Sequence, residues 1–143
     1  MARYEIGVTK TTGAAAGLLC QLRSGTARDI RLFEVGIFSS TAVSGEVALI
    51  RPSAVGATFT SSGVGAPLDP ATIAGVTVVD TLATTAPTIG TNYMRRIVLP
   101  GSIGAGVIWT FPTGISITTS GSLALWQLSA LAVTYSVYFD YDE

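Results

Sequence analysis

VTYSVYFDYDE (133–143) alternates between apolar and polar side chains along most of its length. Every second residue from Val133 to Tyr141 is apolar, and these residues fall on one side of an extended chain because side chains alternate across a strand. The stretch therefore predicts an amphipathic strand with one buried face. We expect its acids to keep the chain end solvated and to deter strand addition at a sheet edge; they are Asp140, Asp142 and Glu143.

The rest of the chain continues this pattern. β-Branched and aromatic residues recur in short runs separated by Gly, Pro and Ser, with almost no helical periodicity. This spacing is typical of an all-β sandwich or barrel. The run 106–118 should bend or divide near Pro112 and Gly114, because proline fits poorly in a central strand. The sequence predicts about eight or nine strands, at 3–10, 18–24, 29–39, 45–52, 76–83, 93–100, 106–118, 122–129 and 133–141.

Two segments depart from a simple one-sided sheet. The strand DIRLFEVGIFS (29–39) is apolar on both faces, so one face needs a second cover from a loop or a neighbouring subunit. Strict alternation would place Leu32 and Glu34 on one face and Val35 on the other. Residues 53–75 carry one charge, Asp69, and no clear period, which predicts a long projecting loop of a single domain spanning residues 1–143.

The composition indicates a protein whose surface is partly covered by a partner. Only 12% of the 143 residues are charged and 48% are hydrophobic, which is sparse charge for a freely soluble monomer. A net charge of −1 argues against a nucleic-acid partner, because binding phosphates requires clustered basic residues. Seven of the eight basic residues are arginine, the cation that suits interfaces, although a high-GC genome would produce the same bias.

The residue inventory argues against an enzyme. The chain has no histidine and one cysteine, which removes imidazole bases, Cys-His pairs and the usual zinc sites, so we expect no catalytic residue, metal or cofactor. Cys20 is expected to be a small buried hydrophobe. The stretch before it does not fit a lipidated signal peptide, because Glu5 and Lys10 interrupt the leader and bulky Leu19 precedes the cysteine. No run reaches the ~18 apolar residues that a membrane span requires.

Charged residues inside apolar runs are the candidate interface positions. Glu34 is the acid most deeply embedded in apolar sequence, and if buried it needs an arginine or several backbone donors. Arg31, Arg95 and Arg96 are its candidate partners. Arg95 and Arg96 are adjacent in one strand and must point to opposite faces, so at least one of them should reach another chain or a rim.

Several sequence blocks together resemble a group of small virion proteins of tailed bacteriophages, known as decoration (cement) or minor capsid proteins. The resemblance runs along most of the chain, although no block has the specificity of a catalytic signature. The blocks are MARYEIGV, RLFEVGIFSS, LIRPSA, APLDPAT, YMRRIVLPGS, GVIWTFPTG and SGSLALWQ, followed by the acidic end.

This resemblance implies a jelly-roll-like antiparallel β-sandwich, often trimeric, on the outer surface of a phage head. The expected partners are the major capsid protein and further copies of the chain, and the expected function is to stabilise the shell.

Three alternative functions remain open. The first is a tail, baseplate or fibre-tip component. The second is a lectin-like receptor-binding module, and the third is a glycosidase built on two of the scattered acids. A lectin would use exposed aromatics as a sugar platform. The candidates are Trp109, Trp126, Tyr93 and Phe111, although a core role is more typical of aromatics in β-rich chains.

Overall fold

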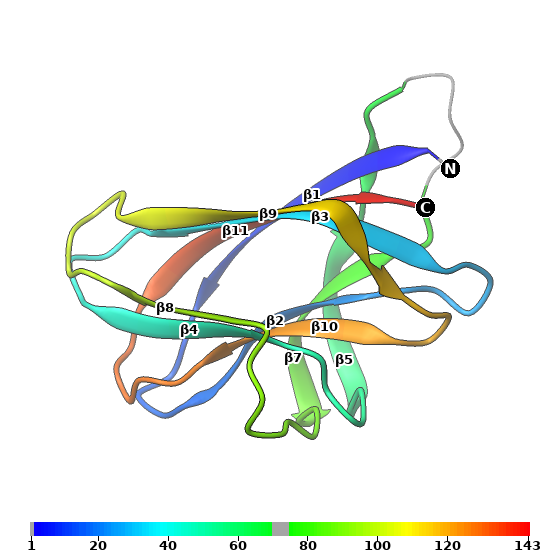
Figure 1. Cartoon of the computed structure of the whole chain (residues 1–143). Helices are drawn as coiled ribbons and strands as arrows, with labels where there is room; N and C mark the ends of the chain where they lie inside the picture. Colours follow the sequence, from blue (N-terminus) through cyan, green and yellow to red (C-terminus); the bar gives the residue numbers. More distant parts are fainter. Residues whose placement is uncertain (1, 70–74) are drawn as a thin grey trace.

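The protein is a sandwich of two antiparallel β-sheets with five and six strands (Figure 1). A computed structural model describes residues 2–69 and 75–143. All nine expected strands are present near their predicted bounds. The strands are β1 (Arg3–Thr11), β2 (Gly17–Arg23), β3 (Ile30–Ser39), β4 (Gly45–Ile50), β5 (Ala57–Val64), β6 (Ala66–Pro67), β7 (Val78–Thr85), β8 (Arg95–Leu99), β9 (Gly106–Ile117), β10 (Ser122–Gln127) and β11 (Thr134–Asp142).

The strand order is that of a jelly roll. One sheet runs β6-β1-β11-β3-β9 and the other runs β5-β7-β2-β10-β4-β8. With β5–β7 set aside, the first strand pairs with the last, the second with the second-last, and so on inward: β1 with β11, β2 with β10, β3 with β9, and β4 with β8. Successive pairs alternate between the sheets, as in one long hairpin rolled into two Greek keys. The all-β, jelly-roll-like prediction is confirmed.

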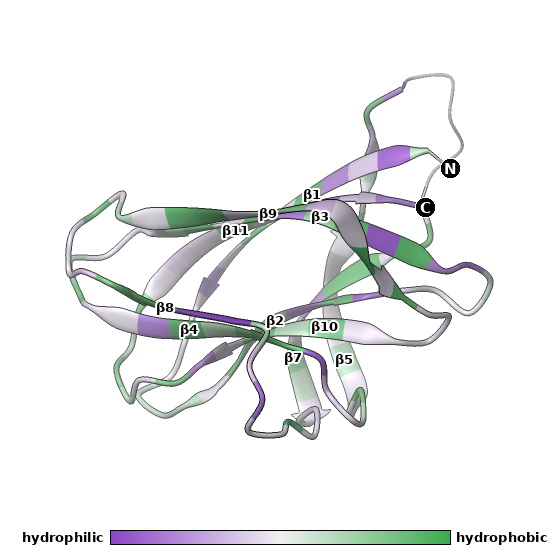
Figure 2. Ribbon diagram, viewed as in Figure 1, coloured by the Kyte–Doolittle hydropathy of each residue, from purple (hydrophilic) through white to green (hydrophobic). Residues whose placement is uncertain are grey.

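The core lies between the sheets and contains the inward residues of 133–141. Val133, Tyr135, Phe139 and Tyr141 are fully buried and Val137 is nearly so, which confirms the predicted alternation of β11. Cys20 is also fully buried, as expected. Figure 2 shows hydrophobic residues along β4, β7 and β10, whereas β8 is hydrophilic over part of its length.

The faces of β3 differ from strict alternation. A register shift between Leu32 and Glu34 places Leu32 and Val35 together in the core, although the alternating pattern predicted opposite faces. A β-bulge has this effect because its extra residue reverses the side-chain phase beyond it. On the outer face Phe33 and Phe38 are half-buried, with Arg3 of β1 over the Phe33 ring and Tyr138 of β11 beside the Phe38 ring, all in the same sheet.

The expected bend in 106–118 occurs inside one strand. β9 is an edge strand, so Pro112 can be accommodated there. Gly114 adopts a left-handed backbone with φ of +69°, and a Cβ at this position would come within 2.2 Å of the Arg31 side chain. Glycine is therefore required for the bend by both conformation and space.

The long loop predicted over 53–75 is corrected for most of its length. Residues 57–64 form β5, which pairs with β7, and residues 66–67 form β6, which pairs with β1. β5 is rich in Thr, Ser and Gly rather than apolar residues, because it lies at the end of its sheet with little core to fill. Residues 70–74 of the predicted loop lie outside the described residues.

Two of the three C-terminal acids are fixed by partners, which corrects the expectation of a solvated sheet edge. β11 lies centrally between β1 and β3. Asp140 accepts two hydrogen bonds from Arg3, at 2.7 and 2.6 Å. Glu143 is only 5% exposed and accepts hydrogen bonds from the backbone amides of Val76 and Thr77. In the part of the chain that the structure describes, no helix has the length and apolarity to cross a membrane.

Candidate interaction surfaces

Three of the four predicted interface residues lie beside the edge strand β9. Arg31 is opposite Ser116 and Glu34 is opposite Thr110 in the β3·β9 pair. Arg95, from the other sheet, places its guanidinium 5.7 Å from the centre of the Phe111 ring. The fold therefore brings Arg31, Glu34 and Arg95 to one side of the sandwich, with Arg96 on the neighbouring outer face.

This side of the molecule is where both sheets end. β8 is the last strand of the six-stranded sheet and β9 the last strand of the five-stranded sheet, and the chain passes directly from one to the other (Figure 1). Large apolar side chains project from it: Val98 is 64% exposed, Ile103 is 74% exposed and Ile108 is 51% exposed. We call β8, β9 and the 100–105 connection the β8–β9 rim.

The two adjacent arginines of β8 point to opposite faces, as predicted. Arg95 reaches across to Phe111 of the facing sheet. Arg96 turns outward, where it forms an ion pair with Glu46 and lies 5.6 Å from the centre of the Tyr93 ring. The hydrogen bond to Glu46 raises the pKa of Arg96, so it stays charged. The rim thus combines exposed apolar groups with two arginines, of which Arg96 is paired with Glu46.

Glu34 does not form the arginine ion pair that the sequence suggested. It is half-buried, and its Oε1 accepts a hydrogen bond of 2.5 Å from the Tyr138 hydroxyl. This bond raises the pKa of Tyr138 to about 12, because losing the proton would leave two negative charges in contact. Tyrosine satisfies the carboxylate here because the bulge in β3 turns Glu34 to the outer face, beside β11.

The outer face of the five-stranded sheet carries a pair of aromatic rings over glycines. The rings of Phe38 and Tyr138 are parallel within 16°, with centres 6.5 Å apart. A Cβ at Gly36 would come within 2.0 Å of the Tyr138 ring, and one at Gly106 within 2.3 Å of the Phe38 ring. Each ring therefore covers the backbone of the next strand, in space that only glycine leaves open.

Two shallow hollows flank the Tyr138–Glu34 hydrogen bond. One, of about 320 Å³, lies over β1 and β11 with Gly7, Thr9 and Ser136 in its lining and the aromatic pair at its side. The other, also about 320 Å³, is lined by residues that include Arg3, Phe33 and Glu34. We call this surface the Phe38–Tyr138 face.

The aromatics named for a sugar platform do not form one. Trp109 is 9% exposed and belongs to the core, and Phe111 packs partly against it. Trp126 is half-buried on β10, and Tyr93 lies beside Arg96 of β8 in the same six-stranded sheet. Sequence reasoning missed Phe38 and Tyr138. The sequence does contain glycines, Gly36 and Gly106, that leave space for these two rings. They could be recognised as such only if the strand pairing were already known.

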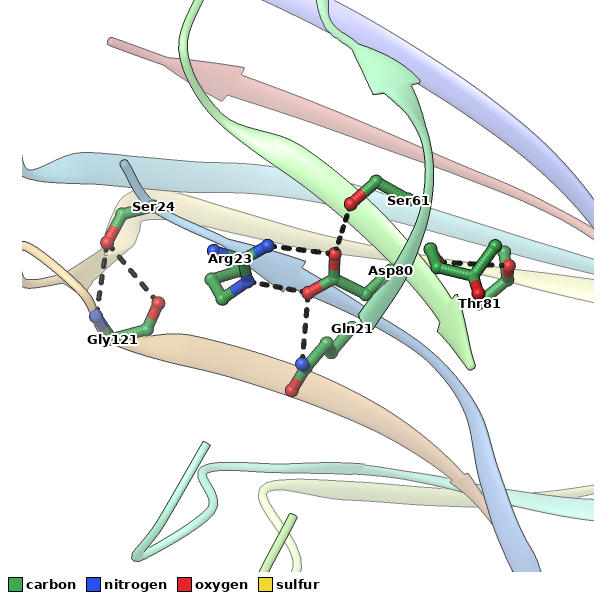
Figure 3. A network of polar contacts seen from close by, with 8 residues as sticks. Gln21, Arg23, Ser24, Ser61, Asp80, Thr81 and Gly121 are labelled. Carbon is green, nitrogen blue, oxygen red and sulfur yellow. Dashed lines mark hydrogen bonds and ion pairs between the residues drawn. The ribbon is translucent and has the colours of Figure 1, made fainter. Parts of the chain in front are cut away.

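The buried acid Asp80 is held in a structural network (Figure 3). It is fully buried on β7 and accepts two hydrogen bonds from Arg23, one from Gln21 and one from Ser61. Arg23 also lies 4.5 Å from the centre of the Phe59 ring. The network joins β2, β7 and β5, so it attaches the β5–β7 hairpin to the jelly roll.

Three acids form one row across the outer face of the five-stranded sheet, because Glu5, Asp140 and Glu34 lie directly opposite one another on β1, β11 and β3. Asp80, Asp140 and Glu143 each have an arginine within 4.0 Å, and these arginines are on different strands or loops. Across residues 2–69 and 75–143, no group of three or more Asp, Glu, Cys or His side chains is placed to hold a metal ion.

No protein-family model matches the chain, and a comparison with curated proteins gives no match.

Proposed function

We propose that the protein is a structural component of a phage virion, a decoration protein that binds the outer surface of the head and stabilises it. The observation that carries the proposal is the β8–β9 rim, whose strands and connection carry three large apolar side chains that are more than half exposed, together with the two arginines of β8. Together with the low charge of the chain and its resemblance to decoration proteins, the rim supports a mechanical function in which apolar and arginine contacts repeat at many symmetric sites.

The rim has the features of a protein-binding surface. Exposed apolar groups near arginine are typical of interface centres, whereas lysine is depleted there. The open side of β9 presents unpaired backbone groups, and Pro112 removes one donor from that strand. The expected occupants are the major capsid protein and, in a homotrimer, further copies of this chain.

Co-sedimentation with expanded, undecorated heads of the phage that encodes the chain tests this function. We expect the purified protein to pellet with heads, and Val98→Asp or Ile108→Asp to reduce the bound fraction at least tenfold, because a carboxylate would be desolvated at the contact. Leu82→Asp is the matched control, since Leu82 is 56% exposed on β7 at the opposite end of the sheet.

One result would contradict the proposed function, and another would contradict the proposed contact surface. Pelleting with purified tails and not with heads would make the chain a tail, baseplate or fibre-tip component. Head binding that survives both rim substitutions but is lost in Leu82→Asp would place the contact at the β5–β7 end instead.

A further inference from the structure

We infer that the Phe38–Tyr138 face is a binding site for a neutral oligosaccharide. The pyranose ring has an apolar C–H face and a rim of hydroxyl groups, so it requires a flat aromatic surface with hydrogen-bonding groups around it. The parallel rings of Phe38 and Tyr138 provide such a surface, and the adjoining hollow brings in the hydroxyls of Thr9 and Ser136.

The ring geometry favours a flat ligand over a cationic one. A quaternary ammonium ligand is held by aromatic rings that surround it as walls. Phe38 and Tyr138 are parallel within 16° and lie over the adjacent glycines, so they form a surface and not an enclosure. The apolar area presented by the two rings suits stacking of a sugar ring.

The charges on this face disfavour anionic ligands, because Glu5, Asp140 and Glu34 lie in one row across β1, β11 and β3. Glu34 and Tyr138 share a hydrogen bond at the centre, and Arg3, the cation at the second hollow, is already paired with Asp140. Single-stranded nucleic acids also stack on aromatic rings, but they require a basic groove along the phosphates. A ligand that donates hydroxyl hydrogens to carboxylates is favoured instead, and a neutral sugar does this.

The two hollows indicate an oligomer rather than a single sugar. Gly7 and Thr9 of β1 line the first hollow, Phe33 and Thr110 line the second, and the Tyr138–Glu34 bond lies between them. A chain that occupied both would contact β1, β11, β3 and β9 in turn. This surface is the outer face of the five-stranded sheet, and it shares β9 with the β8–β9 rim because Thr110, Phe111 and Pro112 line the second hollow. Sugar binding is nevertheless a different activity from head binding, and it is measured on the isolated protein.

Isothermal titration of the purified protein with maltohexaose, cellohexaose and chitohexaose tests the site. We expect at least one of these neutral hexamers to bind, and Phe38→Ala or Tyr138→Ala to weaken that binding at least tenfold. Polysialic acid, an anionic glycan, should not bind.

Gly7→Leu separates binding from folding. A Cβ at Gly7 would meet only the Val137 carbonyl at 3.8 Å, an ordinary contact, so the variant should fold while its side chain fills the first hollow. We expect it to weaken binding at least tenfold. Gly17→Leu is the matched control, because a Cβ there has nothing within 4 Å and Gly17 lines neither hollow.

Three outcomes would overturn the inference. They are the failure of all three neutral hexamers to bind, unchanged affinity in the folded Gly7→Leu variant, and equal affinity for polysialic acid. The titration uses the isolated protein, so it is decided independently of whether the protein binds heads.

Discussion

At the scale of single residues, Tyr135 shows how burial of one hydroxyl couples stability to pH. Its side chain is fully buried, and within the described residues its hydroxyl has no hydrogen-bond partner. Burial raises the pKa of Tyr135 from 10.0 to about 12. The unfolded chain therefore releases this proton first, and the contribution of Tyr135 to stability, complete below pH 10, is lost as the pH rises from 10 to 12.

Tyr135→Phe should flatten this alkaline loss. At pH 7 we expect its unfolding free energy to equal or slightly exceed that of the wild type, because removing an unpaired buried hydroxyl relieves a desolvation penalty. Between pH 10 and 12 it should lose less stability than the wild type, although Tyr138, with its own raised pKa, still contributes some loss. Urea unfolding at pH 7, 10, 11 and 12 measures both, and parallel pH profiles for the two proteins would contradict the assignment.

At the scale of elements, the Asp80 network decides whether the β5–β7 hairpin stays attached. Asp80→Ala would leave Arg23 without its carboxylate and free the hydroxyl of Ser61 on β5. Removing one partner of a buried ion pair costs about 3 kcal/mol of unfolding free energy, and we expect a loss of that size. Hydrogen exchange should show β5 losing protection before β3 or β11 does.

The exposed pair at the rim provides the comparison for Asp80. Glu46→Gln breaks the ion pair with Arg96, whose side chain is 54% exposed, and it should change stability far less because solvent screens that pair. Equal losses in Asp80→Ala and Glu46→Gln, or unchanged protection of β5 in Asp80→Ala, would show that the network does not attach the hairpin.

Local patterns predicted most elements, and they failed where tertiary pairing decides the outcome. The period of 133–141 identified β11 and its inward face correctly, because a half-buried strand records burial in its own alternation. The β3 bulge leaves no such pattern in the sequence: Leu32 and Val35 share the core because β3 has one extra residue, Phe33, in its pairing with β11, and the pairing with β9 also skips Phe33. β5 was missed because an edge strand with little core to fill lacks apolar alternation.

At the scale of the whole molecule, the candidate surfaces were only partly predictable because they assemble from distant strands. Arg95 and Arg96 could be assigned to opposite faces from their adjacency alone. The hydrogen bond between Glu34 and Tyr138 joins residues 104 positions apart, and strand order, which one sequence does not reveal, creates it. The same holds for Glu143, which is buried because β11 ends beside the start of β7.

The first-with-last pairing of the jelly roll makes the final strand essential to the whole fold. β11 pairs with β1 on one side and β3 on the other, and five of its residues or neighbours fill the core. A chain of residues 1–132 should therefore lack cooperative unfolding, because β1 and β3 have no strand to join them. Long-range pairing of this kind also predicts slow folding, on the order of milliseconds to seconds.

A synthetic peptide of residues 133–143, added to the 1–132 chain, should restore the fold. The peptide supplies the central strand and its apolar face. Its Glu143 carboxylate again accepts hydrogen bonds from the backbone amides of Val76 and Thr77. Recovery is measured by near-UV circular dichroism and by the fluorescence of Trp109, which is 9% exposed in the folded core. A peptide of the same composition with its alternation shifted by one residue should fail, because that shift turns the apolar side chains to solvent. Cooperative unfolding of residues 1–132 alone, or equal rescue by the shifted peptide, would mean that β11 is not what closes the sheet.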